Sequence, residues 1–394
     1  MEMVGIIAEY NPFHSGHAWQ IAEARRLTGA RWAVCVMSTV FTQRGDAAIL
    51  PPADRVRMAL LGGADAVFAL PVQWAVRDAE RFAAGGVHLL AALGCDALSF
   101  GMEQADIGLT RQVAALLTEE PPAFRAALQT ALARGESHPA AVAAAAEKCC
   151  PGAHALLAEP NNTLAVCYLR AIRSLGAEMT AVPVPRTGSY RTTVLNGEAS
   201  SAAAIRKAVF SGRRTLPEGV MPPAAEEILR AAAENGRLHR PEALDQALRY
   251  RLLTMTAADW AALPGRAEGL EERLRQAARV STTRAGILLG AKTWRYPLAR
   301  LSRICTCALL QTTQAQLDRT PLPPAAWLLG FRRESEGLLS EIKEKSSLPV
   351  IGKAADYPGK EEDWFRLETR AYDLWALGAG LPAGMAFTQG VVVV

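Results

Sequence analysis

Short apolar runs alternate with longer amphipathic segments over the first half of the chain. The first of these runs, Met3–Ala8, has the pattern of a strand that is buried on both faces. Asn11-Pro12 ends it, because proline fixes φ and cannot donate a hydrogen bond within a central strand. Beyond Gly16 the apolar residues recur at the spacing of a helix. This opening segment therefore predicts a strand, a tight loop and a helix.

Four more buried strands are predicted along the N-terminal half. They are expected at Arg31–Ser38, Ala64–Leu70, Cys95–Gly101 and Met179–Val184. The helices between them are expected at Ala53–Leu61, Asp78–Leu93 and Asn162–Leu175. Strands that alternate with helices form a parallel sheet with right-handed crossovers, which is the α/β doubly wound class. The ligand of such a sheet lies at the carboxyl ends of its strands, of which we expect about five.

The remaining segments are mainly helical. Ala-rich helices over 106–150 indicate an insertion, and the Pro-rich segment Leu216–Pro223 indicates a domain boundary. A chain of 394 residues is typical of two domains, so we expect a sheet domain over 1–215 and a mainly α-helical domain over 216–394. The later elements are expected to be helices at Pro223–Asn235, Pro241–Thr254, Leu270–Arg279, Thr282–Lys292, Pro297–Leu317, Glu334–Lys345 and Trp364–Leu377, with a strand at Leu348–Gly352.

The composition is that of an ordinary globular protein. Half of the residues are hydrophobic and 21% are charged, and a net charge of +4 excludes a global polycation. The seven cysteines are scattered and not at zinc-ligand spacing, so we expect reduced thiols and no metal site. The sequence has no signal peptide and no uninterrupted apolar span, which predicts a cytoplasmic protein without membrane contact. No pattern predicts a protein partner.

Two histidines follow the first strand. His14 and His17 are three residues apart, so both rings lie on one face if they begin the helix. The helix N-terminus directs backbone N–H groups and a positive dipole at the same place. The arrangement predicts a phosphate site that stabilises extra negative charge in a transition state. The alternative is a pair of helix-capping or core histidines.

Polar residues and a glycine follow two other strands where these end. Ser38, Gln43 and Arg44 come after the second strand, and an arginine there can bind a carboxylate with its fork of donors. A solvated surface loop is the alternative. Gly101 ends the fourth strand, where the absence of a Cβ lets a nucleotide approach the backbone. A plain turn glycine is the alternative at that position.

The segment from residue 160 to 207 offers further candidates. Asn161-Asn162 precedes a helix, where an Asn cap is the simpler interpretation. Arg186 follows the last strand of the sheet and is a candidate for ATP binding. The hydroxyls of Ser200-Ser201 begin a helix, and Arg206 lies one turn later. Hydroxyls and N–H groups at a helix start can hold phosphates while an arginine neutralises their charge.

A basic stretch lies in the second domain. Arg273–Arg303 contains eight cationic residues and no acidic residue, with aromatic residues interleaved after Lys292. Cations bind backbone phosphates and aromatic rings stack on unpaired bases, so the stretch predicts RNA binding. A solvated helix face is the alternative. The candidate RNA-binding residues are Arg284, Lys292, Arg295, Tyr296, Arg300 and Arg303.

The segment Gly5–His17, which reads Gly-Ile-Ile-Ala-Glu-Tyr-Asn-Pro-Phe-His-Ser-Gly-His, resembles the opening of the bacterial tRNA(Met) cytidine acetate ligases. Its His-x-Gly-His pattern is that of the class I nucleotidyltransferase and aminoacyl-tRNA synthetase superfamily. The resemblance implies a nucleotidyltransferase-like catalytic domain of the HIGH-type Rossmann-like class over 1–215 and an RNA-binding domain over 216–394. Other segments similar to those of the family are Phe100–Glu103, Pro160–Leu164, Ala199–Arg206 and Lys292–Arg300.

The resemblance also implies roles for individual residues. His14, His17 and Arg206 are expected to be catalytic, and the acid pocket is expected to contain Ser38, Gln43 and Arg44. The residues expected to bind ATP are Ile7, Ala8, Glu9, Tyr10, Asn11, Pro12, Phe13, His14, Ser15, Gly16, His17, Gly101, Asn161, Asn162, Arg186, Thr187, Ser200 and Ser201. In the family the segment after the second strand usually reads Ser-Gly-Asn-Phe-Val-Gln-Arg-Gly, so Thr39-Val40 departs from it in the expected pocket wall.

The reaction that the resemblance implies uses ATP, with Mg²⁺ expected beside it, and acetate. The enzyme would form acetyl-adenylate and transfer the acetyl group to N4 of the wobble cytidine of elongator tRNA(Met), giving N4-acetylcytidine. The residue patterns alone also allow a small-molecule adenylyltransferase, which needs no RNA-binding stretch. A catalytically inactive nucleotide- and RNA-binding protein is the remaining alternative, although the presence of both His14 and His17 disfavours it.

Overall fold

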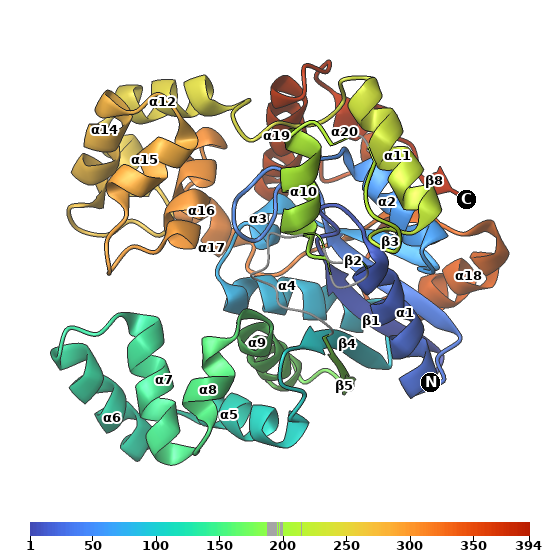
Figure 1. Cartoon of the computed structure of the whole chain (residues 1–394). Helices are drawn as coiled ribbons and strands as arrows, with labels where there is room; N and C mark the ends of the chain where they lie inside the picture. Colours follow the sequence, from blue (N-terminus) through green and yellow to red (C-terminus); the bar gives the residue numbers. More distant parts are fainter. Residues whose placement is uncertain (187–194, 196, 198–199, 214) are drawn as a thin grey trace.

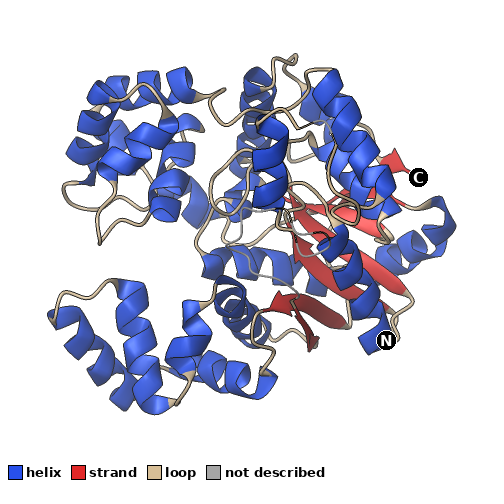
Figure 2. Cartoon of the chain, viewed as in Figure 1, coloured by secondary structure: helices blue, strands red, loops and turns tan. Residues whose placement is uncertain are grey.

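The computed structural model describes residues 1–186, 195, 197, 200–213 and 215–394. A mixed sheet runs through it with helices on both sides (Figure 1, Figure 2). Within the described residues the sheet has eight strands in the order β5-β4-β1-β2-β3-β6-β7, and β8 also pairs with β6. The first five strands are all parallel to their neighbours: β1 (Met3–Ala8), β2 (Trp32–Ser38), β3 (Ala66–Leu70), β4 (Ala97–Met102) and β5 (Thr180–Pro185).

These five parallel strands and their crossover helices confirm the predicted α/β doubly wound class. Close packing of helix on sheet explains one glycine of β1, because a Cβ at Gly5 would lie 2.7 Å from the Leu90 side chain. Leu90 belongs to the helix that crosses β1 and β2. The helices of this part are α1 (Ser15–Thr28), α2 (Pro52–Leu61), α3 (Val72–Ala75), α4 (Ala79–Ala92) and α9 (Pro160–Ser174).

The C-terminal part of the chain returns to the same sheet, so the expectation of about five strands is wrong. β6 (Ala326–Phe331) pairs antiparallel with β3, and β8 (Val392–Val393) pairs parallel with β6. The expected strand at Leu348–Gly352 corresponds to β7 (Val350–Ile351). The sheet therefore extends across the boundary expected near residue 215. A short apolar run such as β6 carries no periodicity that separates a strand from a buried helix turn, and its partner lies far away in the sequence.

Two groups of helices lie beside the sheet on the same side of the molecule (Figure 1). The first, here called the insertion, comprises α5 (Ile107–Glu119), α6 (Pro122–Ala133), α7 (His138–Cys149) and α8 (Ala153–Ala158). The second, here called the helical module, comprises α12 (Asp245–Thr254), α13 (Ala257–Ala262), α14 (Leu270–Val280), α15 (Arg284–Ala291) and α16 (Leu298–Leu309). No helix of the described segments is long and apolar enough to cross a bilayer.

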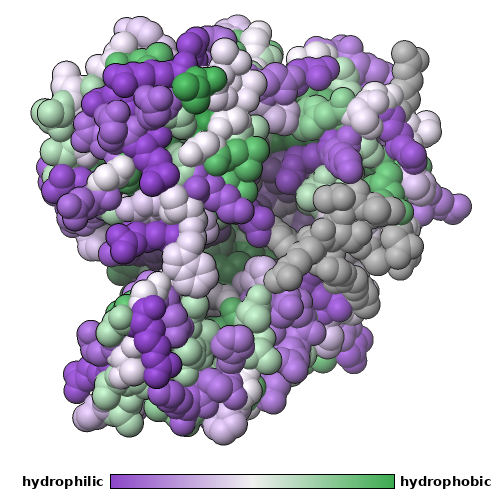
Figure 3. All heavy atoms as spheres, turned by 60° about the vertical axis from the view of Figure 1, so that its left-hand side comes forward, coloured by the Kyte–Doolittle hydropathy of each residue, from purple (hydrophilic) through white to green (hydrophobic). Residues whose placement is uncertain are grey.

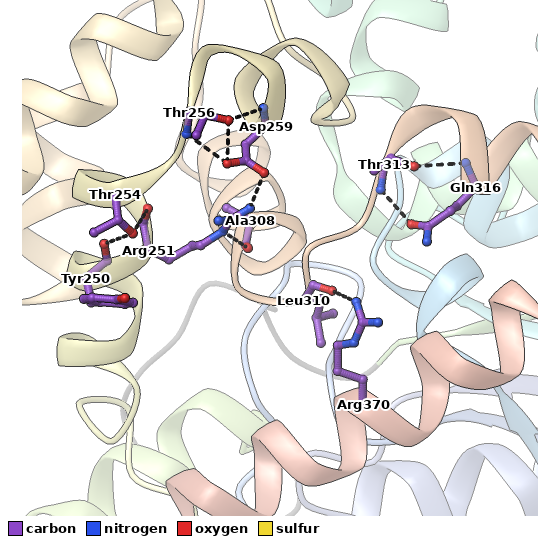
Figure 4. Close-up of polar contacts among 10 residues, drawn as sticks. All are labelled: Tyr250, Arg251, Thr254, Thr256, Asp259, Ala308, Leu310, Thr313, Gln316 and Arg370. Atoms are coloured by element: carbon purple, nitrogen blue, oxygen red, sulfur yellow. Dashed lines mark hydrogen bonds and ion pairs between the residues drawn. The ribbon is translucent and has the colours of Figure 1, made fainter.

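The helical module is fastened internally and to the helix that follows β7 by arginine side chains (Figure 4). Arg251 donates to the carbonyl of Ala308 at 3.3 Å and to Asp259 at 3.0 Å, which joins three of its helices. Arg370 donates to the carbonyl of Leu310 at 2.8 Å, just past the end of α16. The remaining elements are α10 (Ala202–Phe210), α11 (Pro223–Glu234), α17 (Gln314–Arg319), α18 (Glu336–Lys345), α19 (Asp363–Gly378), α20 (Met385–Thr388) and two 3₁₀ turns (Arg333–Ser335, Ala354–Asp356).

Candidate active site

The loop between β1 and α1 is held from several sides at the carboxyl end of the sheet. Tyr10 adopts a left-handed φ of 44°, and its ring is buried at 4.9 Å from that of Phe13. The Asn11 side chain accepts a hydrogen bond from the N–H of Ile49 at 2.8 Å, and Arg206 of α10 donates to the Asn11 carbonyl. These contacts bring Arg206 to the histidine loop, although 195 residues separate it from Asn11 in the sequence.

His14 and His17 begin α1 as a reciprocal cap. The Nδ1 atom of His14 accepts from the N–H of Gly16 at 3.1 Å, and the Nδ1 atom of His17 accepts from the N–H of His14 at 3.2 Å. The two rings are stacked with centroids 3.7 Å apart. Because each Nδ1 accepts a hydrogen bond, each neutral ring carries its proton on Nε2. Both histidines therefore cap the helix, as the alternative expected. Capping also fixes the tautomer and leaves both Nε2–H groups as donors.

Burial and positive charge keep both rings neutral. Desolvation, followed by the nearby charge of Arg186, lowers the pKa of His14 to about 3. Desolvation also lowers the pKa of His17 well below its usual value, with the neighbouring His14 and then Arg186 adding to the shift. At neutral pH the pair therefore offers hydrogen-bond donors and does not act as a proton source.

Arg186 lies across the end of β4. Its backbone N–H donates to the carbonyl of Met102 at 2.8 Å, and a Cβ added at Gly101 would lie 3.1 Å from the Arg186 side chain. The glycine thus leaves room for the arginine as well as for a ligand at this strand end. Thr187, the next expected ATP-binding residue, falls outside the described residues.

The serine pair lies at the start of α10, close to the same loop. Ser201 is the N-cap of α10, and its hydroxyl accepts from the N–H of Ala204 at 3.1 Å. Ser200 is 3% exposed and Ser201 is 6% exposed. Through Arg206 the same helix contacts the histidine loop, so α10 brings a capped N-terminus and a cation to one place.

Arg55 is a site residue that the sequence analysis missed. Its side chain is completely buried and donates to backbone carbonyls of Glu9, Tyr10, Ser38 and Thr39. It therefore ties the carboxyl end of β1 to that of β2. The signal lay in the helical pattern, because Arg55 precedes Ala59 by four residues and so shares the apolar face of α2. Burial lowers the pKa of Arg55 to about 10.

The expected acid pocket has one exposed cation and two anchored residues. The backbone N–H of Gln43 donates to the carboxylate of Glu9, and its side chain donates to the Arg77 carbonyl at 2.8 Å. Arg44 is exposed. Ser38 is fully buried behind the Arg55 guanidinium, and its place in the acid pocket stays a prediction.

The departure from the usual family sequence lies behind the pocket wall. Thr39 and Val40 are both completely buried, and the Thr39 carbonyl accepts from Arg55. These side chains therefore shape the wall through packing and have no contact with solvent. Burial raises the pKa of Glu9, the carboxylate at this loop, while Arg55, Arg44 and Arg206 oppose the increase.

The asparagine pair organises the turn after β4. The Asn162 side chain is completely buried, and its oxygen accepts from the N–H groups of Glu103 and Gln104 at 3.1 and 3.3 Å. In return, Glu103 accepts from the N–H of Asn162 and from the Asn161 side chain. Asn162 therefore positions the turn, and its contact with the nucleotide stays a prediction. Asn161 is half-buried beside it.

The expected RNA-binding residues separate into two groups. Arg284 is a structural residue, because its largely buried guanidinium donates to the Gly45 carbonyl and to the hydroxyls of Ser302 and Thr306. Tyr296 is 5% exposed and donates to the Glu268 carbonyl, so its ring offers no stacking face. The structure thus places both side chains inside the helical module, and their contact with RNA stays an untested prediction. The spacing of residues in a sequence does not reveal which side chains a helical module covers.

The remaining four cations of the expected RNA surface lie at or near the outside. Lys292 and Arg295 are exposed, and Arg300 and Arg303 are half-buried on α16. Trp294, beside them, is 67% exposed and donates to the Gly135 carbonyl of the insertion. Figure 3 shows the surface hollowed between the upper and lower helical groups, which are the helical module and the insertion.

The described residues do not form a metal-binding site of their own. Among them no three His, Cys, Asp or Glu side chains gather closely enough to hold an ion. Glu9, the carboxylate at the loop, already accepts a backbone N–H and faces three arginines. The donor set at the site is therefore suited to anions.

Comparison with known proteins assigns this chain to a family. A family model described as HIGH Nucleotidyl Transferase matches residues 1–383. A protein named tRNA(Met) cytidine acetate ligase from Acetivibrio thermocellus is 33% identical over the whole of both chains. A protein of the same name from Bacillus subtilis is 33% identical over 95% of this chain and 92% of its own. The chain belongs to the tRNA(Met) cytidine acetate ligase family.

Solved structures agree with this assignment over the full length. The crystal structure of Thermotoga maritima TmcAL without ligand superposes with a TM-score of 0.92 at 25% identity, covering all of both chains. The same protein bound with alpha-thio ATP superposes with a TM-score of 0.91 at 26% identity, again over all of both chains. Membership of a ligase family within the HIGH nucleotidyltransferases confirms the resemblance seen in the sequence.

Proposed function

We propose that this chain is an ATP-dependent acetate ligase that forms acetyl-adenylate and transfers the acetyl group to N4 of the wobble cytidine of elongator tRNA(Met). The observation that carries the proposal is the stacked pair His14 and His17, whose Nδ1 atoms are both occupied by backbone N–H groups. The full-length relatives named tRNA(Met) cytidine acetate ligase supply the acid and the RNA.

The first step needs positioning and charge stabilisation. A carboxylate oxygen of acetate attacks the α-phosphorus of ATP, and the bond to the β-phosphate oxygen breaks to release pyrophosphate. The Nε2–H groups of His14 and His17 donate to phosphate oxygens as negative charge develops there. Arg206 on α10 and Arg186 at the end of β4 neutralise the negative charge of the phosphates. Arg44, exposed on the loop after β2, would bind the acetate carboxylate.

The second step moves the acetyl group to RNA. The N4 amine of the cytidine attacks the acetyl carbonyl, the bond to the AMP oxygen breaks, and the amine loses one proton. Extruding a base costs least in a single-stranded loop, which suits an anticodon position. The surface is hollowed between the insertion and the helical module (Figure 3), and this hollow is where the proposed RNA loop would approach.

Mg²⁺ would enter with ATP and would add charge stabilisation at the phosphates. Among the described residues no three His, Cys, Asp or Glu side chains gather as a separate metal site. His14, His17, Arg186 and Arg206 provide the donors to the phosphates.

Acetate-dependent exchange of labelled pyrophosphate into ATP, measured without RNA, tests the proposal. We expect exchange with acetate, and a rate lower by about 10²- to 10³-fold when His14 is replaced by Ala. A small-molecule adenylyltransferase would show exchange only with its own phosphorylated precursor, and an inactive binding protein would show none. Either result would reject the proposed ligase.

A further inference from the structure

A basic cavity lies between the sheet part of the molecule and the helical module. It has a volume of about 300 Å³. Its lining comes from the start of α4, from the loop before α14, from one side of α16 and from Gln314. Four of its lining side chains are arginines: Arg77, Arg81, Arg300 and Arg303. Two of them come from the segment at the start of α4 and two from α16, so residues more than 200 positions apart in sequence form one cationic wall.

The single carboxylate in this lining does not neutralise the cavity. Asp78 is the N-cap of α4, where it accepts from the N–H of Arg81 at 3.0 Å and pairs with the Arg81 guanidinium at 3.0 Å. Within the described part of the chain, neither Arg77 nor Arg303 has a carboxylate within ion-pair distance. Both arginines are half-buried, and burial lowers the pKa of each; Asp78 opposes this shift at both, and neighbouring arginines add to it. Such a wall favours an anion.

The cavity is connected to the active-site loop. The side chain of Gln43 donates to the Arg77 carbonyl at 2.8 Å, and its backbone N–H donates to the Glu9 carboxylate. On the other side, a Cβ at Gly45 would lie 2.9 Å from the backbone of Arg303. The loop after β2 therefore contacts both the wall of the cavity and Glu9 of the histidine loop.

We propose that this cavity binds a backbone phosphate of the RNA beside the nucleotide that enters the active site. The inference rests on the proposed function, which it extends by assigning Arg77 and Arg81 to RNA recognition together with Arg300 and Arg303. Guanidinium groups match phosphate oxygens with paired donors, and half-buried ones need little reorganisation to do so. The exposed cations Lys292 and Arg295 belong to the same helical module and extend the contact along the RNA backbone.

The test measures binding of an elongator tRNA(Met) transcript to the full chain over a series of salt concentrations. The variants are Arg77→Gln, Arg81→Gln and their combination. Because the Arg81 side chain is exposed, its replacement should leave the fold intact. The Arg81 variant therefore keeps the test valid even if the Arg77 variant unfolds. We expect the double variant to bind about ten-fold more weakly at low salt, with the slope of log Kd against log salt reduced by roughly one per lost phosphate contact.

Arg230→Gln is the matched control, because it removes the same charge from α11, far from the helical module (Figure 1). Unchanged tRNA affinity and slope in the Arg77 and Arg81 variants would overturn the inference. A raised KM for ATP with unchanged tRNA affinity would also overturn it and would assign the cavity to nucleotide phosphates. Pyrophosphate exchange by the unaltered chain reports separately on the proposed function, so the two failures are distinguishable.

Discussion

The rings of His14 and His17 stack with centroids 3.7 Å apart, and each ring accepts a backbone N–H at Nδ1. The cap of α1 and the proposed catalytic pair are thus the same two side chains. Local folding of the helix start fixes the direction in which both Nε2–H donors point. The same contact explains why a spacing of three residues is required, because the reciprocal cap joins the N-cap residue to the third residue of the helix.

Replacing His14 by Ala should lower the rate of pyrophosphate exchange by about 10²- to 10³-fold, because one preorganised donor to the developing charge is lost. Loss of the cap alone should cost only about 1 kcal/mol of stability. Asp106→Ala is the matched control. Asp106 caps α5, which belongs to the insertion, by accepting a hydrogen bond of 2.9 Å from the N–H of Leu109. Equal loss of exchange in both variants would contradict a catalytic role of His14.

The histidines should also make stability depend on pH in a defined window. The pKa of His14 in the folded chain is about 3, below the value of about 6.5 expected when it is unfolded. The unfolded chain therefore binds more protons in acid, so this contribution is fully present above pH 6.5 and is lost as the pH falls toward 3. Urea unfolding at pH 7, 6 and 5 should show the free energy of unfolding decreasing by up to about 1.4 kcal/mol per unit for this residue.

His14→Gln is the comparison for that measurement, because glutamine does not titrate. The variant should show a shallower decrease in the free energy of unfolding between pH 7 and 5 than the unaltered chain. Parallel pH dependences for the two proteins would mean that His14 does not hold a lowered pKa in the folded state.

Arg55→Met should destabilise the chain by about 3–5 kcal/mol, because it leaves the carbonyls of Glu9, Tyr10, Ser38 and Thr39 without their buried partner. Arg57→Met on the same helix is the control, since Arg57 is exposed and should change stability by less than about 0.5 kcal/mol. Urea unfolding monitored by circular dichroism compares the two. Similar midpoints would show that Arg55 does not join the two strand ends.

Gly45→Ala should disturb the loop after β2 for two reasons. Its φ of +82° is unfavourable for alanine, and the new Cβ would lie 2.9 Å from the backbone of Arg303. Gly135→Ala has nearly the same φ of +83° but no atom within 4 Å of the new Cβ, so it isolates the cost of the backbone conformation. We expect acetate-dependent exchange to fall in the first variant well beyond its fall in the second, and equal effects would exclude the close approach of the loop to α16.

Lys292→Ala combined with Arg295→Ala should weaken tRNA binding and reduce its salt dependence, because both side chains are exposed beside Trp294. Filter binding at several salt concentrations measures both effects. If the same double variant instead lost adenylate formation, the division of labour between the helical module and the histidine loop would be wrong.

The sequence predicted the five parallel strands because each is an apolar run bounded by clear breaks, as in Met3–Ala8. It did not predict β6, whose partner β3 lies far earlier in the chain, because pairing of distant segments leaves no periodic signal. It also merged α16 and α17 into one helix. The structure separates them at Gln311, which has a φ of 52° that only the folded environment reveals.

The placement of His14 and His17 on one face at the start of α1 was predictable, because chemistry and local pattern coincide there. The site was not predictable where burial decides the role of a side chain. Tyr296 and Arg284 have the composition of an RNA surface yet serve the interior of the helical module. Arg55 is the opposite case. It is a charged residue on a helix, and only its hydrogen bonds in the structure show that its side chain points into the protein.

The most direct test incubates the chain with ATP, labelled acetate and an unmodified elongator tRNA(Met) transcript, then digests the RNA for mass spectrometry. We predict N4-acetylcytidine at the wobble position, dependent on both ATP and acetate, and formed about 10²- to 10³-fold more slowly with His14→Ala. Unmodified cytidine with the unaltered chain, or an unchanged rate of acetylation without the His14 imidazole, would contradict the central claim.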